Sequence, residues 1–198
     1  MPHSFKAQGL KFEDVCVRYA RYYILKNHKD YGLIRSGWES YGRELNPISP
    51  LDFNKKKAKE IVNQLGLSSK MVGRMPDIAI VKWINTRKTK FVINSFIECK
   101  QGQDRRLVDG STEHSVSVKN GQADLLKTIT ETGFKVHVLA SSREGDWFYT
   151  VDFDHSLLKE VRTSPEYRVL ALEHSDSFRS HVNIFRAMEH ITESLRPR

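Results

Sequence analysis

Apolar residues recur at helical spacing in three parts of the chain. Between residues 11 and 28 they line one side while charged residues line the other, which predicts an amphipathic helix. A second helical period covers residues 58–65. A third covers residues 120–132, where Gly133 provides a stop signal. These patterns predict three helices before the C-terminal quarter of the chain.

Short apolar runs between these helices predict strands. Residues 77–83 and 90–100 are two such runs, and the polar turn 85–88 between them predicts an antiparallel hairpin. A further strand, with its register at Leu33 to Arg35, is expected inside 31–37. Two more are expected at 135–140 and 147–153. The helix between the hairpin and the next strand indicates a crossover.

The remaining segments complete the expected organisation. Residues 38–75 form an insertion with one helix. A loop of about seventeen residues, rich in Gly, Ser and charge, follows Lys100. Helical patterns at 157–161 and 182–195 predict a helical extension over 155–198, packed on the sheet or at a subunit contact. We expect one domain over 1–198 of α/β class, with a central mixed sheet flanked by helices.

Charge, apolar runs and cysteine spacing restrict the classes of function that this chain can have. The chain has 198 residues and a net charge of +8, which favours a polyanionic partner because each neutralised phosphate releases counterions. No run is apolar enough to span a bilayer, and the N-terminus lacks a secretory signal, so we expect a cytoplasmic protein with no membrane partner. Cys16 and Cys99 have no CxxC partner, which argues against zinc.

Three charged residues of the predicted hairpin form the candidate site. Pro76 places Asp77 at the opening of the first strand, and the two-residue period puts Glu98 and Lys100 on one face of the second, roughly 7 Å apart. Antiparallel pairing sets the start of one strand against the end of the other. Two carboxylates this close favour a bound cation, and hard oxygen ligands suit Mg²⁺, with Mn²⁺ as a substitute. A site of this kind, with Lys100 beside the attacking water, fits phosphodiester hydrolysis.

Pro76-Asp77, an apolar strand and Ile97-Glu98-Cys99-Lys100 resemble the PD-(D/E)XK nuclease superfamily. The resemblance implies a restriction-endonuclease-like core and Mg²⁺ held by Asp77 and Glu98. It also implies that the backbone carbonyl of Cys99 is a ligand and that Glu13, on the first helix, completes the metal site. Asp14 is the adjacent alternative to Glu13. Hydrolysis is then expected to leave a 5′-phosphate and a 3′-hydroxyl.

Two groups within the superfamily are similar to parts of this chain. Residues 96–139 resemble VRR-NUC nucleases, in which a glutamine opens the helix after ExK, and here Gln122 takes that place. The segment 33–37 resembles the Arg-x-x-Ser-Gly region of archaeal Holliday junction resolvases, which implies DNA contacts by Arg35 and Ser36. These enzymes act as dimers, so the resemblance also implies a homodimer.

Further basic and aromatic residues are candidates for DNA contact. The lysines at the start of the 58–65 helix and the arginines after the ExK strand are placed to meet the phosphate backbone. Trp38 and Tyr41 either stack on an unpaired base or pack in the core. The predicted phosphate contacts are Lys55, Lys56, Arg105, Arg106 and Lys119.

Together these features predict a metal-dependent DNA endonuclease of phage, bacterial or archaeal type. Structure-specific cutting of branched DNA, as by a Holliday junction resolvase or a flap nuclease, is favoured over cutting of ordinary duplex. A DNA-binding module without turnover and a sequence-specific restriction enzyme remain alternatives.

Overall fold

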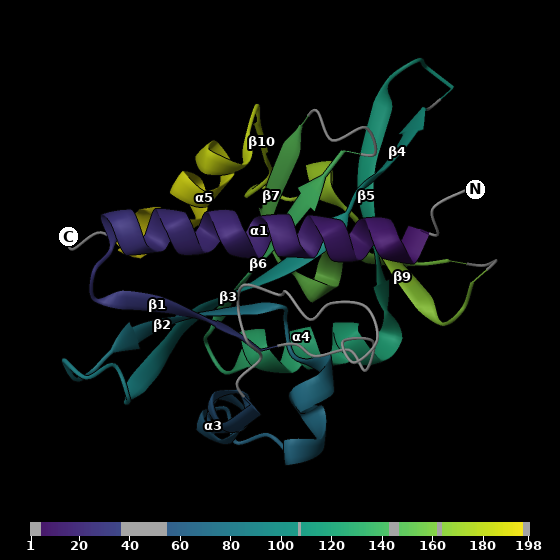
Figure 1. Cartoon of the computed structure of the whole chain (residues 1–198). Helices are drawn as coiled ribbons and strands as arrows, with labels where there is room; N and C mark the ends of the chain where they lie inside the picture. Colours follow the sequence, from purple (N-terminus) through teal and green to yellow (C-terminus); the bar gives the residue numbers. More distant parts are fainter. Residues whose placement is uncertain (1–4, 37–54, 107, 143–146, 162–163, 196–198) are drawn as a thin grey trace.

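Six strands form a central mixed sheet in the computed structural model, in the order β1-β2-β3-β6-β7-β10 (Figure 1). Every neighbouring pair is antiparallel except β3 and β6, which are parallel. The strands are β1 (Tyr31–Arg35), β2 (Ile78–Trp83), β3 (Phe91–Gln101), β6 (Lys135–Ser141), β7 (Phe148–Asp152) and β10 (Arg179–His181). The structure describes residues 5–36, 55–106, 108–142, 147–161 and 164–195.

Helices cover both faces of this sheet. α1 (Phe5–Asn27) and α5 (Ile184–Thr192) lie together on one face, and α3 (Lys55–Gln64) and α4 (Asn120–Glu131) lie on the other (Figure 1). α4 ends where Gly133 takes a φ of +90°, and α5 begins where the Asn183 side chain accepts from the Arg186 amide at 3.0 Å. Short 3-10 helices lie at η1 (Ser69–Arg74), η2 (His155–Leu157), η3 (Leu172–His174) and η4 (Glu193–Leu195).

A smaller antiparallel sheet, in the order β4-β5-β9-β8, packs on the α4 side of the central sheet. Its Val116, Val118 and Leu170 are buried in the same hydrophobic cluster as Phe96 and Val138 of the central sheet. The two sheets therefore share one core. The strands of the smaller sheet are β4 (Gln103–Arg106), β5 (Thr112–Lys119), β8 (Leu158–Glu160) and β9 (Tyr167–Ala171).

The predicted fold class, a central mixed sheet flanked by helices, is confirmed. The elements that surround the candidate site are also those expected from the sequence: a first helix, a short strand, an antiparallel hairpin, and a crossover helix that leads into a further strand. The antiparallel pairing of β1 with β2 was not predicted. The helix expected inside the insertion is α3, and the one expected at 182–195 is α5 followed by η4.

Two predictions for connecting segments are wrong. The long loop expected after Lys100 is the β4–β5 hairpin, whose strands carry few apolar residues and so gave little period-two signal. The helix expected at 157–161 is the end of η2 followed by strand β8, so the extension over 155–198 is not wholly helical. It adds strands to both sheets. Among the described residues, no helix is long and apolar enough to cross a membrane.

Candidate active site

The start of β2 and the end of β3 meet on the α4 side of the central sheet. Asp77 directly precedes β2, and the antiparallel register sets it opposite Glu98. The backbone N–H of Cys99 donates to Asp77 Oδ2 at 2.8 Å, which holds that carboxylate against β3. Lys100 Nζ lies 2.6 Å from Glu98 Oε1. The structure thus brings Asp77, Glu98 and Lys100 together.

Gln122, in the first turn of α4, joins this group. Its Nε2 donates to Glu98 Oε1 at 2.7 Å, and its Oε1 accepts from Lys100 Nζ at 3.0 Å. The amide therefore closes a ring of three polar side chains. Since one side chain meets both the carboxylate and the ammonium, Gln122 fixes their positions relative to each other.

Burial and like charge dominate the electrostatics of the acids. Burial raises the pKa of Asp77 well above its usual value, and the charges of Glu98 and Glu13 raise it further. Lys100 and the Cys99 amide act in the opposite direction without cancelling this rise. The mutual repulsion of these acids is thus only partly offset by the Lys100 ammonium.

The donor set fits a hard divalent cation. Glu98 is only 1% exposed, and its Oε2 is buried without a hydrogen-bond partner in the described part of the chain. A buried carboxylate oxygen of this kind is costly unless a cation or donor meets it. In residues 5–36 and the other described ranges, no three His, Cys, Asp or Glu side chains are grouped closely enough to hold a metal ion. The site accordingly offers two acids, with oxygen atoms of the type that Mg²⁺ prefers.

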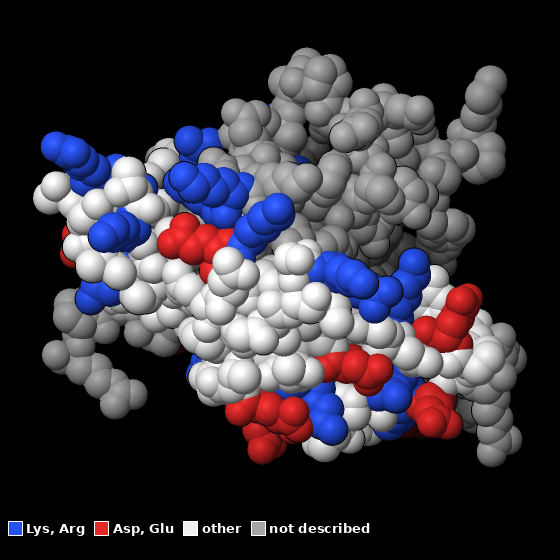
Figure 2. Space-filling model, turned by 90° about the horizontal axis from the view of Figure 1, so that it is seen from below, with Lys and Arg blue, Asp and Glu red and all other residues white. Residues whose placement is uncertain are grey.

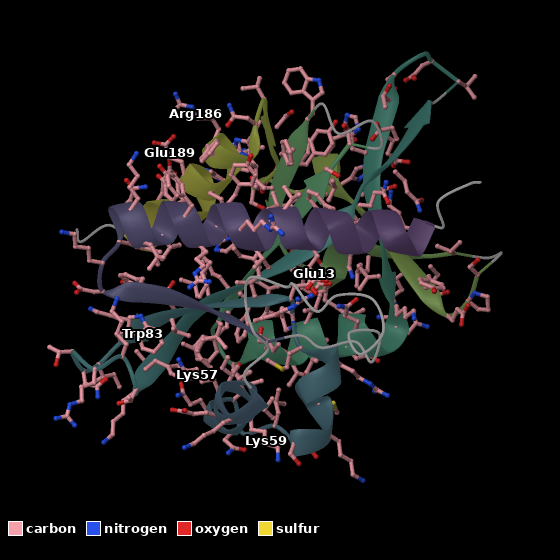
Figure 3. The ribbon with its side chains drawn as sticks, in the orientation of Figure 1. Glu13, Lys57, Lys59, Trp83, Arg186 and Glu189 are labelled. Atoms are coloured by element: carbon pink, nitrogen blue, oxygen red, sulfur yellow. The ribbon has the colours of Figure 1, made fainter. Side chains whose placement is uncertain are left out.

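Glu13 lies near this pair without joining it. It projects from α1 toward β1, where its carboxylate accepts a hydrogen bond from the Arg35 guanidinium (Figure 3). Its charge still contributes to the raised pKa of Asp77. Arg35, predicted to contact DNA, is thus ion-paired and mostly buried, with 16% of its side chain exposed. The side chain of Asp14, the alternative acid, lies outside the described residues.

Ser36 supports the backbone next to the acids. It is fully buried, and its hydroxyl donates to the Pro76 carbonyl at 2.6 Å. Its amide donates to the Asp77 carbonyl at 3.0 Å. These two bonds tie the chain after β1 to the residues that carry Asp77. The DNA contact predicted for Ser36 stays a prediction.

The backbone and the side chain of Cys99 have different roles. Its amide holds Asp77, whereas its thiol is packed in the core beneath α1. A hydrogen bond with Cys16 and burial raise the pKa of the Cys99 thiol well above its usual value, so the thiol stays protonated and unreactive. The role of its carbonyl as a metal ligand stays a prediction.

The predicted phosphate contacts are dispersed. Lys56 is exposed on α3, and Lys119 is exposed at the junction of β5 and α4. The side chains of Lys55, Arg105 and Arg106 lie outside the described residues, as do Trp38 and Tyr41. Figure 2 shows the side that carries α3 and α4, where the Lys and Arg side chains of the described residues are interspersed with Asp and Glu.

Arg74 is a basic residue that sequence reasoning missed. It ends η1, three residues before Asp77, and its side chain reaches the start of α4: a Cβ built on Gly121 would lie 3.6 Å from Arg74 Nη1. The guanidinium therefore lies beside the first turn of α4, one residue from Gln122. Its position just upstream of Pro76-Asp77 was the signal that could have identified it.

Comparisons with known proteins give little beyond this geometry. No family model matches the chain, and no curated protein matches it in sequence. Among solved structures, the chain is similar to Hjc, a Holliday junction resolvase from the archaeal hyperthermophile Archaeoglobus fulgidus. The identity is 12%, the TM-score is 0.35, and the alignment covers 86% of this chain and 98% of that one. The TM-score is too low for this likeness to carry an argument about the reaction.

Proposed function

We propose that this chain is a divalent-metal-dependent deoxyribonuclease that hydrolyses phosphodiester bonds. One observation carries the proposal: the buried Glu98 carboxylate has an oxygen with no hydrogen-bond partner among the described residues, and it lies beside a second acid, Asp77. An ammonium and a glutamine amide hold that carboxylate in place. Such a pair is costly to bury unless it binds a cation, and the +8 charge of the chain favours a polyanionic substrate.

Asp77 and Glu98 would hold Mg²⁺, or Mn²⁺ in its place, with Glu13 and the Cys99 carbonyl as further candidate ligands. When bound, the ion polarises the scissile phosphate and lowers the pKa of water. Arg35 pairs with Oε1 of Glu13, so a contact between Glu13 and the ion would use its Oε2 or break that ion pair.

The remaining chemistry falls to Lys100 and Gln122. The Lys100 ammonium is placed to orient the attacking water and to neutralise charge that develops on the phosphate oxygens. Gln122 holds that ammonium and the Glu98 carboxylate in fixed positions relative to each other. Water attacks phosphorus in line, the bond to the 3′ oxygen breaks, and that oxygen takes a proton. The products are a 5′-phosphate and a 3′-hydroxyl.

We further propose that the substrate is branched DNA and that the protein acts as a homodimer. Cutting two strands of a junction in a coordinated way needs two active sites, which a twofold-symmetric dimer supplies. Sedimentation equilibrium measures this directly, and a monomer at micromolar concentration would contradict the dimer without affecting the chemistry of one site.

Cleavage of defined DNA tests the activity. Four-way junction, flap and linear duplex are incubated with the wild-type protein in Mg²⁺ or EDTA, and with Asp77→Asn and Glu98→Gln. The matched control is Asp124→Asn, because this carboxylate is 65% exposed on the outer side of α4. We expect metal-dependent cutting by the wild type and the control, and loss of cutting in both site variants. Cutting by Asp77→Asn would overturn the proposed site.

The same assay separates the alternatives. A DNA-binding module without turnover predicts that wild type and variants bind junctions equally and cut none. A restriction enzyme predicts discrete fragments from a plasmid and no preference for branched over linear DNA.

A further inference from the structure

A second recess lies beyond the candidate active site, between the smaller sheet and the edge of the central sheet. It is a cavity of about 500 Å³. The β4–β5 hairpin and η3 form one side, and the residues around β7 and β10 form the other. Its principal lining residues are Asp104, His114, Trp147, Tyr149, Glu173 and Phe178.

Aromatic rings form one wall of this cavity. The rings of His114 and Tyr149 are stacked, with centroids 4.5 Å apart and planes at 26°. Tyr149 is stacked in turn on Phe178, at 5.7 Å and again 26°. Trp147 also lines the cavity and remains 46% exposed, although its backbone is fixed by bonds to Ser142. The wall therefore offers flat, partly open ring surface to a planar ligand.

Two carboxylates face the same space. Asp104 Oδ1 lies 2.8 Å from His114 Nδ1, and Glu173 Oε2 accepts from the His114 amide at 3.0 Å. Their side chains remain 31% and 32% exposed, so both keep oxygen atoms within reach of a ligand. Burial raises the pKa of Tyr149, and the charges of these two acids raise it further, which reflects the negative potential here. This potential excludes phosphate and favours a ligand edge that carries N–H donors.

The cavity is near the candidate active site. Asp104 follows Lys100 by four residues, so their Cα atoms are at most about 14 Å apart. A DNA strand bound at Glu98 can therefore place the base of a nearby nucleotide in this cavity, with its phosphate outside.

We propose that the cavity binds an unpaired nucleobase of the DNA substrate, stacked on Trp147 and hydrogen-bonded through its exocyclic amino group to Asp104 or Glu173. The proposal rests on the proposed function, because it takes DNA as the partner. A planar base uses both the stacked rings and the acceptors, and DNA bound at Glu98 brings such a base within reach of the cavity, which favours a base over the side chain of a protein partner. Carboxylates accept from the exocyclic amino group of cytosine, which has two N–H donors, whereas thymine offers only its single ring N3–H between two carbonyl oxygens that the acids repel. Cytosine is therefore bound more tightly than thymine.

Binding to forked DNA tests this without cleavage. Fluorescence anisotropy in EDTA measures the Kd of Asp77→Asn protein for a duplex with an unpaired arm of dC, an unpaired arm of dT, or no arm. In this parent protein, the second substitution Trp147→Ala is expected to raise the Kd for the dC arm at least fivefold, as expected for the loss of one stacked base. Added Asp104→Asn is expected to abolish the preference for dC over dT. The conservative Trp147→Phe keeps a ring and should retain most of the affinity.

Tyr22→Ala is the matched control, since Tyr22 is an exposed aromatic residue on α1, with 56% exposure. Equal Kd values for Trp147→Ala and the parent, or equal binding of dC and dT by the parent, would overturn the cavity proposal and leave the nuclease proposal standing. Failure of the parent to bind any of the three DNAs would overturn both. Perturbation of the Trp147 indole NMR signal by N-acetylargininamide but not by deoxycytidine would assign the cavity to a cationic side chain.

Discussion

At the scale of single residues, the site depends on the Glu98 carboxylate, whose two partners both meet the same oxygen atom. Glu98 is buried, and Lys100 and Gln122 both engage its Oε1. Its Oε2 has no partner in the described part of the chain. The sequence predicted this cluster because strand periodicity places residues 98 and 100 on one face. It could not predict that Glu13 would pair with Arg35, because that contact depends on how α1 lies over β1.

Gln122 is expected to act by positioning its neighbours. Gln122→Ala removes the bonds to Glu98 and Lys100, and loss of such an outer contact in a metal site lowers activity roughly ten- to a hundredfold. Steady-state cleavage should show the loss in kcat with little change in KM. A change in KM alone would contradict this role and indicate a contact with the DNA backbone.

Asp152 makes the free energy of unfolding depend on pH in the acid range. A hydrogen bond from His137, reinforced by Lys135, lowers the pKa of Asp152 to about 2 from the usual 3.8. A depressed pKa stabilises the folded state above pH 3.8, and this contribution is lost as the pH falls toward 2. Because Asp152 is 40% exposed, we expect about 1 kcal/mol.

Urea unfolding of wild type and Asp152→Asn checks this. The variant should be less stable at pH 7, and the difference should shrink below pH 4. Asp30→Asn, at an exposed carboxylate, serves as the control. A difference that stays constant down to pH 3 would contradict the assignment.

At the scale of elements, the strand that carries the site leads directly from the central sheet into the smaller one. β3 carries Glu98 and Lys100, and after Gly102 the chain continues as β4 in the smaller sheet. The apolar runs that form β2, β3, β6 and β7 were predictable, since each is long enough to show its period. β4, β8 and β10 have four residues or fewer, and partners distant in the chain determine their pairing, so no local pattern indicates them.

Gly102 is expected to tolerate no side chain at this crossing. A Cβ there would lie 2.6 Å from the Ser141 carbonyl oxygen, which also accepts the Gly102 amide at 2.8 Å. Gly102→Ala must therefore displace backbone, at a cost of roughly 1–3 kcal/mol. Urea denaturation measures the loss, and Gly110→Ala is a comparison at an open turn whose φ of +85° strains the alanine without a contact. Equal stability of Gly102→Ala and wild type would contradict the close approach.

At the scale of the whole molecule, the candidate site borders the core that the two sheets share. The surface on its α3 and α4 side carries scattered basic residues (Figure 2). The chain has a net charge of +8, and on the α3 and α4 side its described basic residues are interspersed with acidic ones (Figure 2). We therefore expect DNA affinity to rest on a few well-placed cations. The charge was evident from the sequence, whereas the approach of Arg74 to Gly121 emerged only from the fold.

Arg74→Ala should weaken binding of junction and duplex DNA alike. If the guanidinium contacts one phosphate, the slope of log K against log salt should fall by about one. Lys127→Ala is the control, since Lys127 is ion-paired with Glu131 farther along α4. An unchanged slope for Arg74→Ala would mean that no phosphate lies beside the start of α4.

The central claim is that Asp77 and Glu98 together bind a hard divalent cation. Crystals of the wild-type protein grown with Mn²⁺, with diffraction recorded for anomalous scattering, test it most directly. We expect an anomalous peak in contact with both carboxylates and its absence in Asp77→Asn. A peak elsewhere, with Glu98 Oε2 still unpartnered beside Asp77, would contradict it.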